Sequence, residues 1–469
     1  MLTQELQAEI LNWLNSEERK EQLTAAKYYE GKHDILSRQR EVIGVDGSLE
    51  PVNNLPNHRI VDNQYRLLVD KKTNYALGKP FTVSTERDDY AKELTKIFTR
   101  NFFKKARVLG RDAINGGMAW LHPYYSQTGD LKFKVFSSQE VFPQWMDSDH
   151  EELAYAVRIY PVKIYENSSP RIIHKVELYT VNGVEYYRYQ SGSFIEDKPA
   201  SAYLMIDETP YNWGKVPLIP FRYNSDEIPL IRFTKQLQDA INLISSNFCN
   251  AMDEDPRTTI LVLKNYDGEN LGEFRKNLAT YGVVKVRSMD GMQGNVETLR
   301  IEVNAQNYQA VLSHLKRSLV ENGRGFDAKE ERMDGDPNQM NIMSMYTDID
   351  IDTNGMETEF QQGFEELMWF INQHLIRIGK GDFTEEQVEL VFNRDIFINE
   401  AELIENCVKS TGIISTETIV SKHPWVVDLK RELKLLKQEE EELMFNERLQ
   451  EDRGEEPSTS ESSNRNSDT

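Results

Sequence analysis

The residues best suited to chemistry are a group of oxygen-bearing side chains near residue 350. Their spacing matches positions 1, 3, 5, 7 and 12 of an EF-hand calcium loop: Asp348, Asp350, Asp352, Asn354 and Glu359. The sixth position, where glycine normally makes the sharp turn, is Thr353. The same acids also fit the start of a helix, where carboxylates favour the positive end of the dipole. We therefore expect no metal and no cofactor, and keep Asp348, Asp350, Asp352 and Glu359 as the alternative: a metal-dependent enzyme.

Other catalytic patterns are missing from the sequence. There is no phosphate-binding G-x-x-x-x-G-K-[ST], no G-x-G-x-x-G, no G-x-S-x-G nucleophile turn and no zinc-binding H-E-x-x-H. The eight histidines are scattered along the chain. We therefore expect a protein that is not an enzyme.

An unusual stretch, MDGDPNQMNIMSMYTDID, covers residues 333–350 and leads into these acids. Gly335 and Pro337 are typical of a loop. Methionines cluster in the same stretch, and methionine is a soft apolar side chain used at adaptable contact surfaces. The pattern favours a loop that makes adaptable contacts.

Composition narrows the possible partners. The 469 residues carry 77 acidic and 55 basic side chains, a net charge of −22. Nucleic-acid binders usually show a basic surface that collects phosphates, so any contact with DNA should have little affinity. The basic helix at 104–111, with Lys104, Lys105, Arg107 and Arg111, is interpreted as solvated or subunit-facing, with a DNA contact as the alternative. Two cysteines fit a reducing compartment, and no apolar run is long enough for a membrane span.

Hydrophobic periodicity predicts an α+β chain. Helices are expected over 61–77 and 90–115, the second ending at the NGG of 115–117. From 118 to 224, short aromatic and β-branched runs separated by turn signals predict an antiparallel sheet. A helix from Pro229 to about 255 and another after Asn304 flank a small α/β block, which suggests a helical hairpin with a tip. A long helix over 356–378, a strand over 388–392 and shorter C-terminal helices follow, before a disordered acidic tail.

This order of parts resembles the tailed-bacteriophage portal proteins of the SPP1-like group. Several strings are similar to that family's sequences: KYYEGKHDI (27–35), NNLPNHRIVDNQYRLLVDKKTNYALGKP (53–80), the segment 111–145 and STGIISTETIVSKHPWVVD (410–428). The resemblance covers about residues 20–440. The sequence departs from the family at the loop-to-helix junction, where relatives carry small residues and a lysine and this chain reads PNQMNIMSM (337–345).

The resemblance implies a subunit with stem, clip, wing and crown that assembles into a ring, usually of twelve copies. The implied parts are 1–117 as the helical part of the wing, 118–225 as the β-rich wing, 226–255 and 304–325 as the stem helices, 256–303 as the α/β clip, 326–352 as the tunnel loop, 353–395 as the long wing helix and strand, 396–450 as the helical crown, and 451–469 as the tail.

The resemblance also implies a function and partners. Double-stranded DNA would pass through the ring at one capsid vertex during packaging and ejection. The terminase large subunit and head-completion or connector proteins would dock on the clip, and the major capsid and scaffolding proteins would surround the ring. The protein would reside in the virion after assembly in the host bacterial cytoplasm, with no membrane contact.

Site residues follow from the same mapping. The tunnel loop would present Asn338, Gln339, Met340, Asn341, Met343 and Ser344 to the DNA. The stem would use Lys235, Gln238, Lys316 and Arg317. The clip would offer Lys264, Asn265, Tyr266, Lys285, Arg287 and Met289 to partners. Besides the metal-dependent enzyme, a capsid adaptor or scaffold protein without a DNA channel stays open as an alternative.

Overall fold

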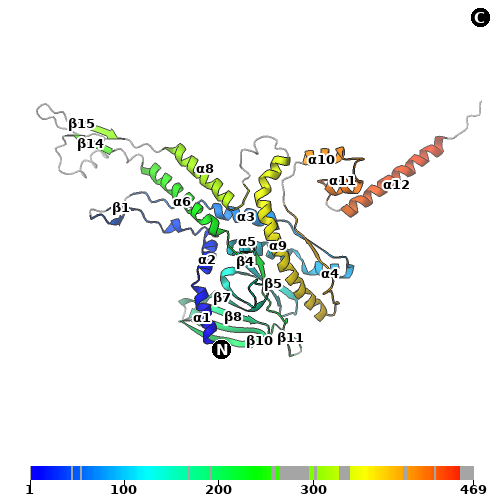
Figure 1. Ribbon diagram of the computed structural model, residues 1–469, viewed down its shortest axis with the longest axis horizontal. Coiled ribbons are helices and arrows are strands. Elements are labelled where there is room, and N and C mark those ends of the chain that lie inside the picture. The colour runs from blue at the N-terminus through cyan, green and yellow to red at the C-terminus, as the bar shows by residue number, and fades with distance from the viewer. Residues whose placement is uncertain are drawn as a thin grey trace, which may run out of the picture. The chain divides into compact units, whose positions relative to one another are not determined.

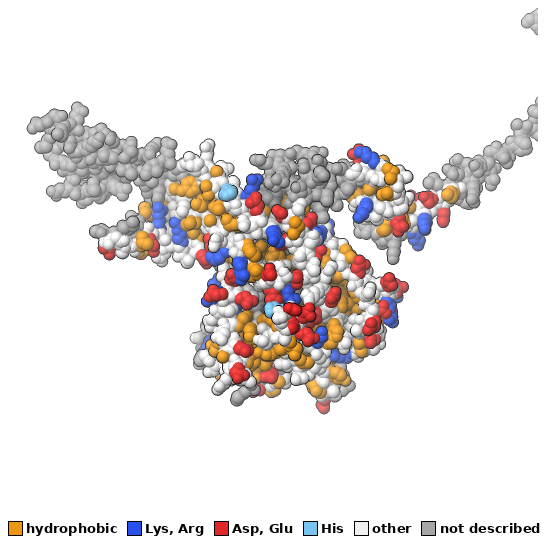
Figure 2. Space-filling model, in the orientation of Figure 1, with side chains coloured by type: hydrophobic (Ala, Val, Ile, Leu, Met, Phe, Trp, Pro, Cys, Tyr) orange, Lys and Arg blue, Asp and Glu red, His pale blue; other side chains and the backbone are white. Residues whose placement is uncertain are grey.

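The computed structural model describes residues 2–43, 46–52, 55–166, 169–190, 192–206, 208–254, 260–264, 295–299, 304–326, 339–394, 400–426 and 429–454 (Figures 1 and 2). Contacts divide the chain into two units. One comprises residues 1–328 with 346–395, and the other comprises 329–345 with 396–469. Both helices and antiparallel strands occur, so the predicted α+β class is confirmed.

Helices form most of the first unit outside its sheets. They are α1 (Gln4–Leu14), α2 (Glu17–Tyr29), α3 (Gln64–Leu77), α4 (Asp88–Ile97), α5 (Arg100–Gly116), α6 (Ile231–Glu254), α8 (Ala305–Asn322) and α9 (Gln339–Arg377), with 3-10 turns η1 (Asp34–Ser37) and η2 (Ser138–Glu140). Asn63 and Asn304 cap α3 and α8 by accepting hydrogen bonds from the amides of Arg66 and Asn307.

The strands of the first unit pair only in antiparallel fashion among the described residues. They are β1 (Glu41–Ile43), β2 (Leu49–Pro51), β3 (Thr82–Ser84), β4 (Met118–Tyr125), β5 (Leu131–Ser137), β6 (Val141–Trp145), β7 (Leu153–Glu166), β8 (Ser169–Thr180), β9 (Gly183–Gln190), β10 (Ser193–Ser201), β11 (Leu204–Ile206), β12 (Thr209–Tyr211), β13 (Ile219–Arg222), β14 (Ile260–Lys264), β15 (Asn295–Leu299) and β16 (Glu389–Val391). The largest sheet has the order β10-β9-β8-β7-β6, and a second has β13-β4-β5.

Two apolar layers hold the sheets in place. Trp13 and Ile10 of α1 pack with Val157 and Val176 on the five-stranded sheet. Trp120 and other side chains of β4 and β5 pack with the same sheet in a second cluster. The antiparallel sheet predicted over 118–224 is confirmed by the strand pairing, and side chains of the five-stranded sheet reach an apolar cluster on each face.

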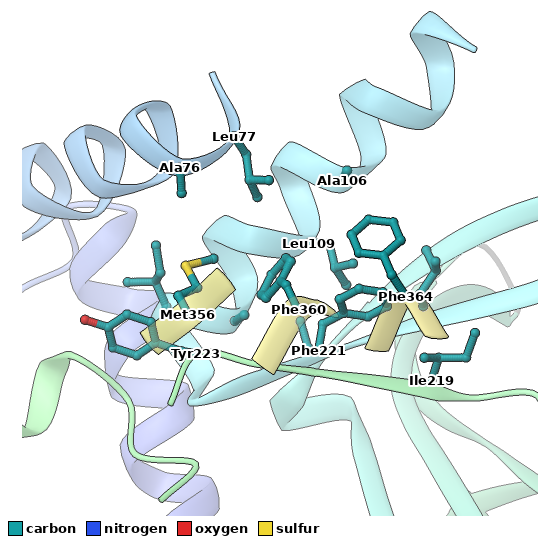
Figure 3. Close-up of a cluster of buried hydrophobic side chains, with 14 of the residues drawn as sticks. Ala76, Leu77, Ala106, Leu109, Ile219, Phe221, Tyr223, Met356, Phe360 and Phe364 are labelled. Atoms are coloured by element: carbon teal, nitrogen blue, oxygen red, sulfur yellow. The ribbon is translucent and has the colours of Figure 1, made fainter. Parts of the chain in front are cut away.

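The main core lies between α3, α5, α9 and β13. Figure 3 shows Met356, Phe360 and Phe364 of α9 pointing toward Phe221 of β13 and Leu109 of α5. The Phe221 ring lies 5.1 Å from that of Phe360 and 5.3 Å from that of Phe364, centroid to centroid. These contacts fix which face of α9 is buried.

Three predicted boundaries are wrong. The helix expected over 90–115 is two helices, because Phe98 ends α4 and Thr99 precedes a new start at Arg100. The loop expected over 326–352 is helical from Gln339 onward, since α9 begins there. The tail expected from 451 is helical to Gly454. The stop at NGG is confirmed: Gly117 has φ +83°, and a Cβ there would lie 1.9 Å from the Glu227 carbonyl oxygen.

Outside α9, the described residues of the second unit form three helices with turns between them. They are α10 (Glu400–Lys409), α11 (Thr416–Lys422) and α12 (Leu429–Gly454). Ser415 caps α11 by accepting a hydrogen bond from the amide of Thr418. Among the residues that the structure describes, no helix is both long and apolar enough to cross a membrane.

Candidate functional site

The predicted helical hairpin is present as α6 and α8. Phe248 late in α6 packs against Tyr308 early in α8, with ring centroids 5.1 Å apart. At the other end, Gly323 after α8 lies close to Thr234 at the start of α6. The two helices are therefore antiparallel neighbours, as Figure 1 shows.

The tip of the hairpin is described only in part. β14 and β15 pair antiparallel from Ile260 opposite Leu299 to Lys264 opposite Asn295, within the α/β block expected between the two helices. Lys264 is thus on a strand. The other proposed clip residues lie outside the described residues: Asn265, Tyr266, Lys285, Arg287 and Met289. Residues 265–294, the middle of the expected α/β block, also lie outside them.

The inner face of α6 is polar. Five side chains that recur every fourth residue are at most 4% exposed: Thr234, Gln238, Asn242, Ser246 and Asn250. Apolar Phe233, Leu243 and Met252 of the same helix are 52%, 41% and 49% exposed. Figure 2 shows hydrophobic side chains gathered over α6 and α8. Ile231 and Ile241 of α6 are buried as well, but a buried stripe made only of polar side chains is not found on an ordinary amphipathic helix, so hydrogen-bond partners must satisfy these groups.

The partner is the backbone of residues 57–63, here called the strap, which leads into α3. Three strap amides donate to α6 side chains: His58 to Asn250 Oδ1 at 2.7 Å, Ile60 to Ser246 Oγ at 2.9 Å and Asp62 to Asn242 Oδ1 at 3.0 Å. Tyr65 at the start of α3 adds a fourth bond, to Gln238 Oε1 at 2.8 Å. Alternate strap amides thus meet successive turns of α6, and we call this set the ladder.

Asn242 lies at the centre of the ladder. Its Oδ1 also accepts from Gln238 Nε2 at 3.0 Å, and its Nδ2 lies 2.7 Å from His33 Nδ1. The amide donates, so His33 Nδ1 accepts and Nε2–H donates to the Tyr28 carbonyl at 2.9 Å. Burial lowers the pKa of His33, which keeps the ring in this neutral form.

The proposed stem residues have defined places. Gln238 is fully buried in the ladder and cannot line an open surface of this subunit. Lys235 Nζ lies 2.7 Å from both Asp34 and Asp239, and Lys316 Nζ lies 2.7 Å from Asp62. Burial lowers the pKa of Lys235, but its hydrogen bonds to Asp239 and Asp34 raise it by more. Arg317 is exposed on α8.

The acids near residue 350 lie on α9, so the calcium-loop hypothesis is wrong. Asp352 binds Lys72 Nζ at 2.6 Å and accepts from the Tyr223 hydroxyl at 2.9 Å. Lys72 is 2% exposed, and its Nζ also donates to the Arg324 carbonyl at 2.9 Å. Burial lowers the pKa of Lys72 while Asp352 raises it. This pair joins α3 to α9.

Asp350 is also committed to protein partners. Arg394 donates to Asp350 at 2.8 Å and to Glu357 at 2.8 Å, and the Tyr75 hydroxyl donates to Asp350. A helix turns successive carboxylates to different sides, so Asp348 and Glu359 do not join them around one point. Within the described ranges, no group of three or more His, Cys, Asp or Glu side chains could hold a metal ion.

The proposed tunnel-loop residues fall at the start of α9. The helix includes Gln339, Met340, Asn341, Met343 and Ser344, whereas Asn338 lies outside the described residues. The sequence prediction missed Asn242, Ser246 and Asn250. Their signal is visible in the sequence: small polar side chains at every fourth position along a helix form one stripe.

Comparison with known proteins identifies the family of the chain. Residues 13–444 match the family described as phage portal protein, SPP1 Gp6-like. The portal protein of Bacillus phage SPP1 is 27% identical over 426 residues, covering 89% of this chain and 83% of that protein. The portal protein of Clostridium phage phiCD119 is 27% identical over 438 residues, covering 90% and 93%. The chain belongs to the SPP1 Gp6-like family of phage portal proteins.

Proposed function

We propose that this protein assembles into a ring at one capsid vertex and that double-stranded DNA passes through the ring during packaging and ejection. The family match over residues 13–444 carries the proposal, because it spans nearly all parts of the chain. The exposed apolar side chains of α6 and α8 support it. Large exposed apolar surfaces usually mark contacts with other proteins, and neighbouring copies would cover this one.

In this proposal the parts keep the roles expected from the sequence, with one boundary changed. The wing would comprise 1–225 and 353–395, and the crown would comprise 396–450. The stem helices would lie in 226–255 and 304–325, with the clip between them at 256–303. The tunnel loop would be 326–338, and the first turns of α9 would project from it. Terminase and head-completion proteins would dock on the clip, and capsid and scaffolding proteins would contact the outside of the ring.

The charge of the chain suits a conduit that does not hold DNA tightly. Lys and Arg side chains that contact phosphates release counterions and bind strongly. Here Lys235 and Lys316 of the stem are each paired with Asp side chains of the same subunit. With a net charge of −22, the subunit would let the duplex slide rather than fix it.

Electron microscopy of the purified protein tests the assembly. We expect closed rings with a central hole wide enough for a DNA duplex. A protein that stays monomeric or forms open filaments at micromolar concentration would refute the ring. A compact particle without a hole would favour a capsid adaptor instead.

The loop role needs a separate test in packaging. Deleting residues 333–338 leaves α9 intact, since the helix begins at Gln339. We expect this variant to form rings but to package or retain less DNA than the parent. Deletion of the last six residues, 464–469, is the matched control. If the 333–338 deletion prevents ring formation, these residues are part of the subunit interface and the sliding role is wrong.

A further inference from the structure

A basic groove lies between α3 and α5 and has no role in the function proposed above. Its volume is about 240 Å³, and its lining includes Lys104, Arg107, Arg111, Asp70 and Asn74. The three cations stand at positions i, i+3 and i+7 of α5, so they form one stripe along the helix. This local surplus of positive charge contrasts with a subunit whose net charge is −22.

Carboxylates of the same subunit balance the groove only in part. Arg111 lies 2.8 Å from Asp112, and its guanidinium is 5.4 Å from the centroid of the Tyr29 ring. Arg107 donates to the neutral amide oxygen of Asn74. Lys104 is exposed and has no ion pair with any described residue. Two of the three cations are therefore available to carboxylates from elsewhere.

An acidic groove lies along α9. Its volume is about 380 Å³, and four of its lining side chains are Glu151, Glu152, Glu365 and Glu366. Two cations also line it, but Arg222 is bound to Glu227 at 2.9 Å and Lys215 lies over the ring of Trp369. Figure 2 shows Asp and Glu side chains gathered beside α9 on this face.

The ionisation of Glu366 agrees with a surplus of negative charge. Burial raises the pKa of Glu366 to about 7, with a smaller contribution from Glu152, although Lys215 and Arg222 oppose the shift. A cation brought into this groove would lower that pKa and favour the carboxylate. Such a cation would stabilise the ionised form of Glu366, which burial disfavours in the isolated subunit.

The two grooves open in opposite directions. Phe102 of α5 packs near Phe364 of α9, with ring centroids 6.4 Å apart, so these residues mark the faces by which the helices meet. With 3.6 residues per turn, the stripe of Lys104, Arg107 and Arg111 points away from α9. By the same geometry, Glu366 points away from α5.

The stripes also match in length. On α9, Glu359, Gln362 and Glu366 repeat the i, i+3, i+7 spacing of the basic stripe, and each set spans about 10 Å at 1.5 Å per residue. Gln362 and Glu366 of this set line the acidic groove together with Glu365, and Glu359 lies one turn beyond it. We propose that the acidic groove of one copy of this chain docks against the basic groove of the next copy. Because the two surfaces differ and face opposite ways, the contact is head-to-tail, and it can close into a ring. This inference rests on the proposed ring.

Charge reversal tests the contact. We expect Arg107→Glu and Glu365→Arg each to raise the protein concentration needed for half-maximal ring formation by about tenfold or more, since each places like charges opposite one another. The double variant, Arg107→Glu with Glu365→Arg, should return within about threefold of the parent. Lys92→Glu and Glu86→Arg, both exposed and outside either groove, are matched controls that should leave assembly unchanged.

Several outcomes would overturn the proposed contact, and each can be distinguished from failure of the ring itself. If both single variants form rings like the parent, the grooves do not meet, while the ring stands. If the double variant keeps the parent's thermal unfolding but does not recover assembly, the charges do not face each other. If Arg107→Glu assembles normally but weakens binding of duplex DNA to the ring at low salt, the basic groove serves DNA. A parent that forms no ring refutes the proposed function instead.

Discussion

Asn242→Ala gives the most specific prediction, because this amide holds the strap through several bonds at once. The substitution leaves the Asp62 amide and one Gln238 donor without their acceptor, and it leaves His33 Nδ1 without its donor, in a place where Asn242 is fully buried. An unsatisfied buried polar group costs about 1–3 kcal/mol, so three of them cost about 3–9 kcal/mol. We expect at least about 2 kcal/mol of this to destabilise the closed strap, because Asp62 belongs to the strap and Gln238 donates to its carbonyl.

Hydrogen–deuterium exchange of peptides covering 56–67 measures this directly. Since about 1.4 kcal/mol is a factor of ten in an equilibrium constant, 2 kcal/mol predicts exchange roughly 30-fold faster at the strap amides. Asn247→Ala is the matched control: it is the same substitution on the same helix, and the Asn247 side chain makes no hydrogen bond with a described residue.

The two variants must differ for the reasoning to hold. If Asn242→Ala and Asn247→Ala show equal exchange over 56–67, the ladder does not hold the strap. If Asn242→Ala speeds exchange over the whole first unit equally, the bond contributes to global folding and the strap is not a separate element.

Three further predictions concern buried charges. Lys72→Met should lower the free energy of unfolding by about 3–5 kcal/mol because Asp352 loses its buried partner, and Lys72→Met with Asp352→Leu should recover most of that loss. Denaturant titration measures both variants. If the losses of the two single substitutions simply add in the double variant, the pairing is contradicted. Burial lowers the pKa of His122 to about 4, whereas an unfolded histidine titrates near 6.5, so the unfolded state takes up the proton first and stability should fall as pH drops from about 6.5 to 4. His122→Phe should flatten that slope in thermal melts, and an unchanged slope would contradict it. Burial raises the pKa of Glu366 to about 7, so its contribution to folding stability is full below pH 4.5 and is lost as pH rises to 7. Glu366→Gln should therefore be more stable than the parent at pH 8 and equal to or less stable than it at pH 4. Equal melting temperatures of variant and parent at pH 8 would refute this.

The elements were predictable where one face of each is apolar. The strands of 118–224 are short aromatic and β-branched runs separated by turn signals, and α9 carries Met356, Phe360 and Phe364 at helical spacing, so both element types were predicted correctly. The start of α9 was not, because the methionine and asparagine residues near Gln339 occur in loops and helices alike. Local composition does not show whether a neighbouring helix extends through such a stretch or stops before it.

The site was predictable only in outline. The apolar residues of α6 predicted a helix, and the family resemblance assigned Gln238 to the stem, but nothing in the sequence indicated that Gln238 and its neighbour Asn242 are fully buried. Their partners are backbone amides, which every residue except proline carries, so no sequence pattern marks them. The charge grooves were harder still, because each draws residues from separate elements that only the fold brings together.

The bonded groups of the ladder repeat at slightly different distances along α6 and along the strap. Four helical residues advance about 6.0 Å along α6, while two residues of an extended strap advance about 6.6 Å. The mismatch grows by about 0.6 Å at each rung, so such a pairing holds over only a few rungs before the atoms drift apart. After Asp62 the next bond comes three residues later, at Tyr65, where α3 has already begun. The strap can therefore be neither lengthened nor shifted by one residue without losing every rung, and its length sets where α3 starts along the stem.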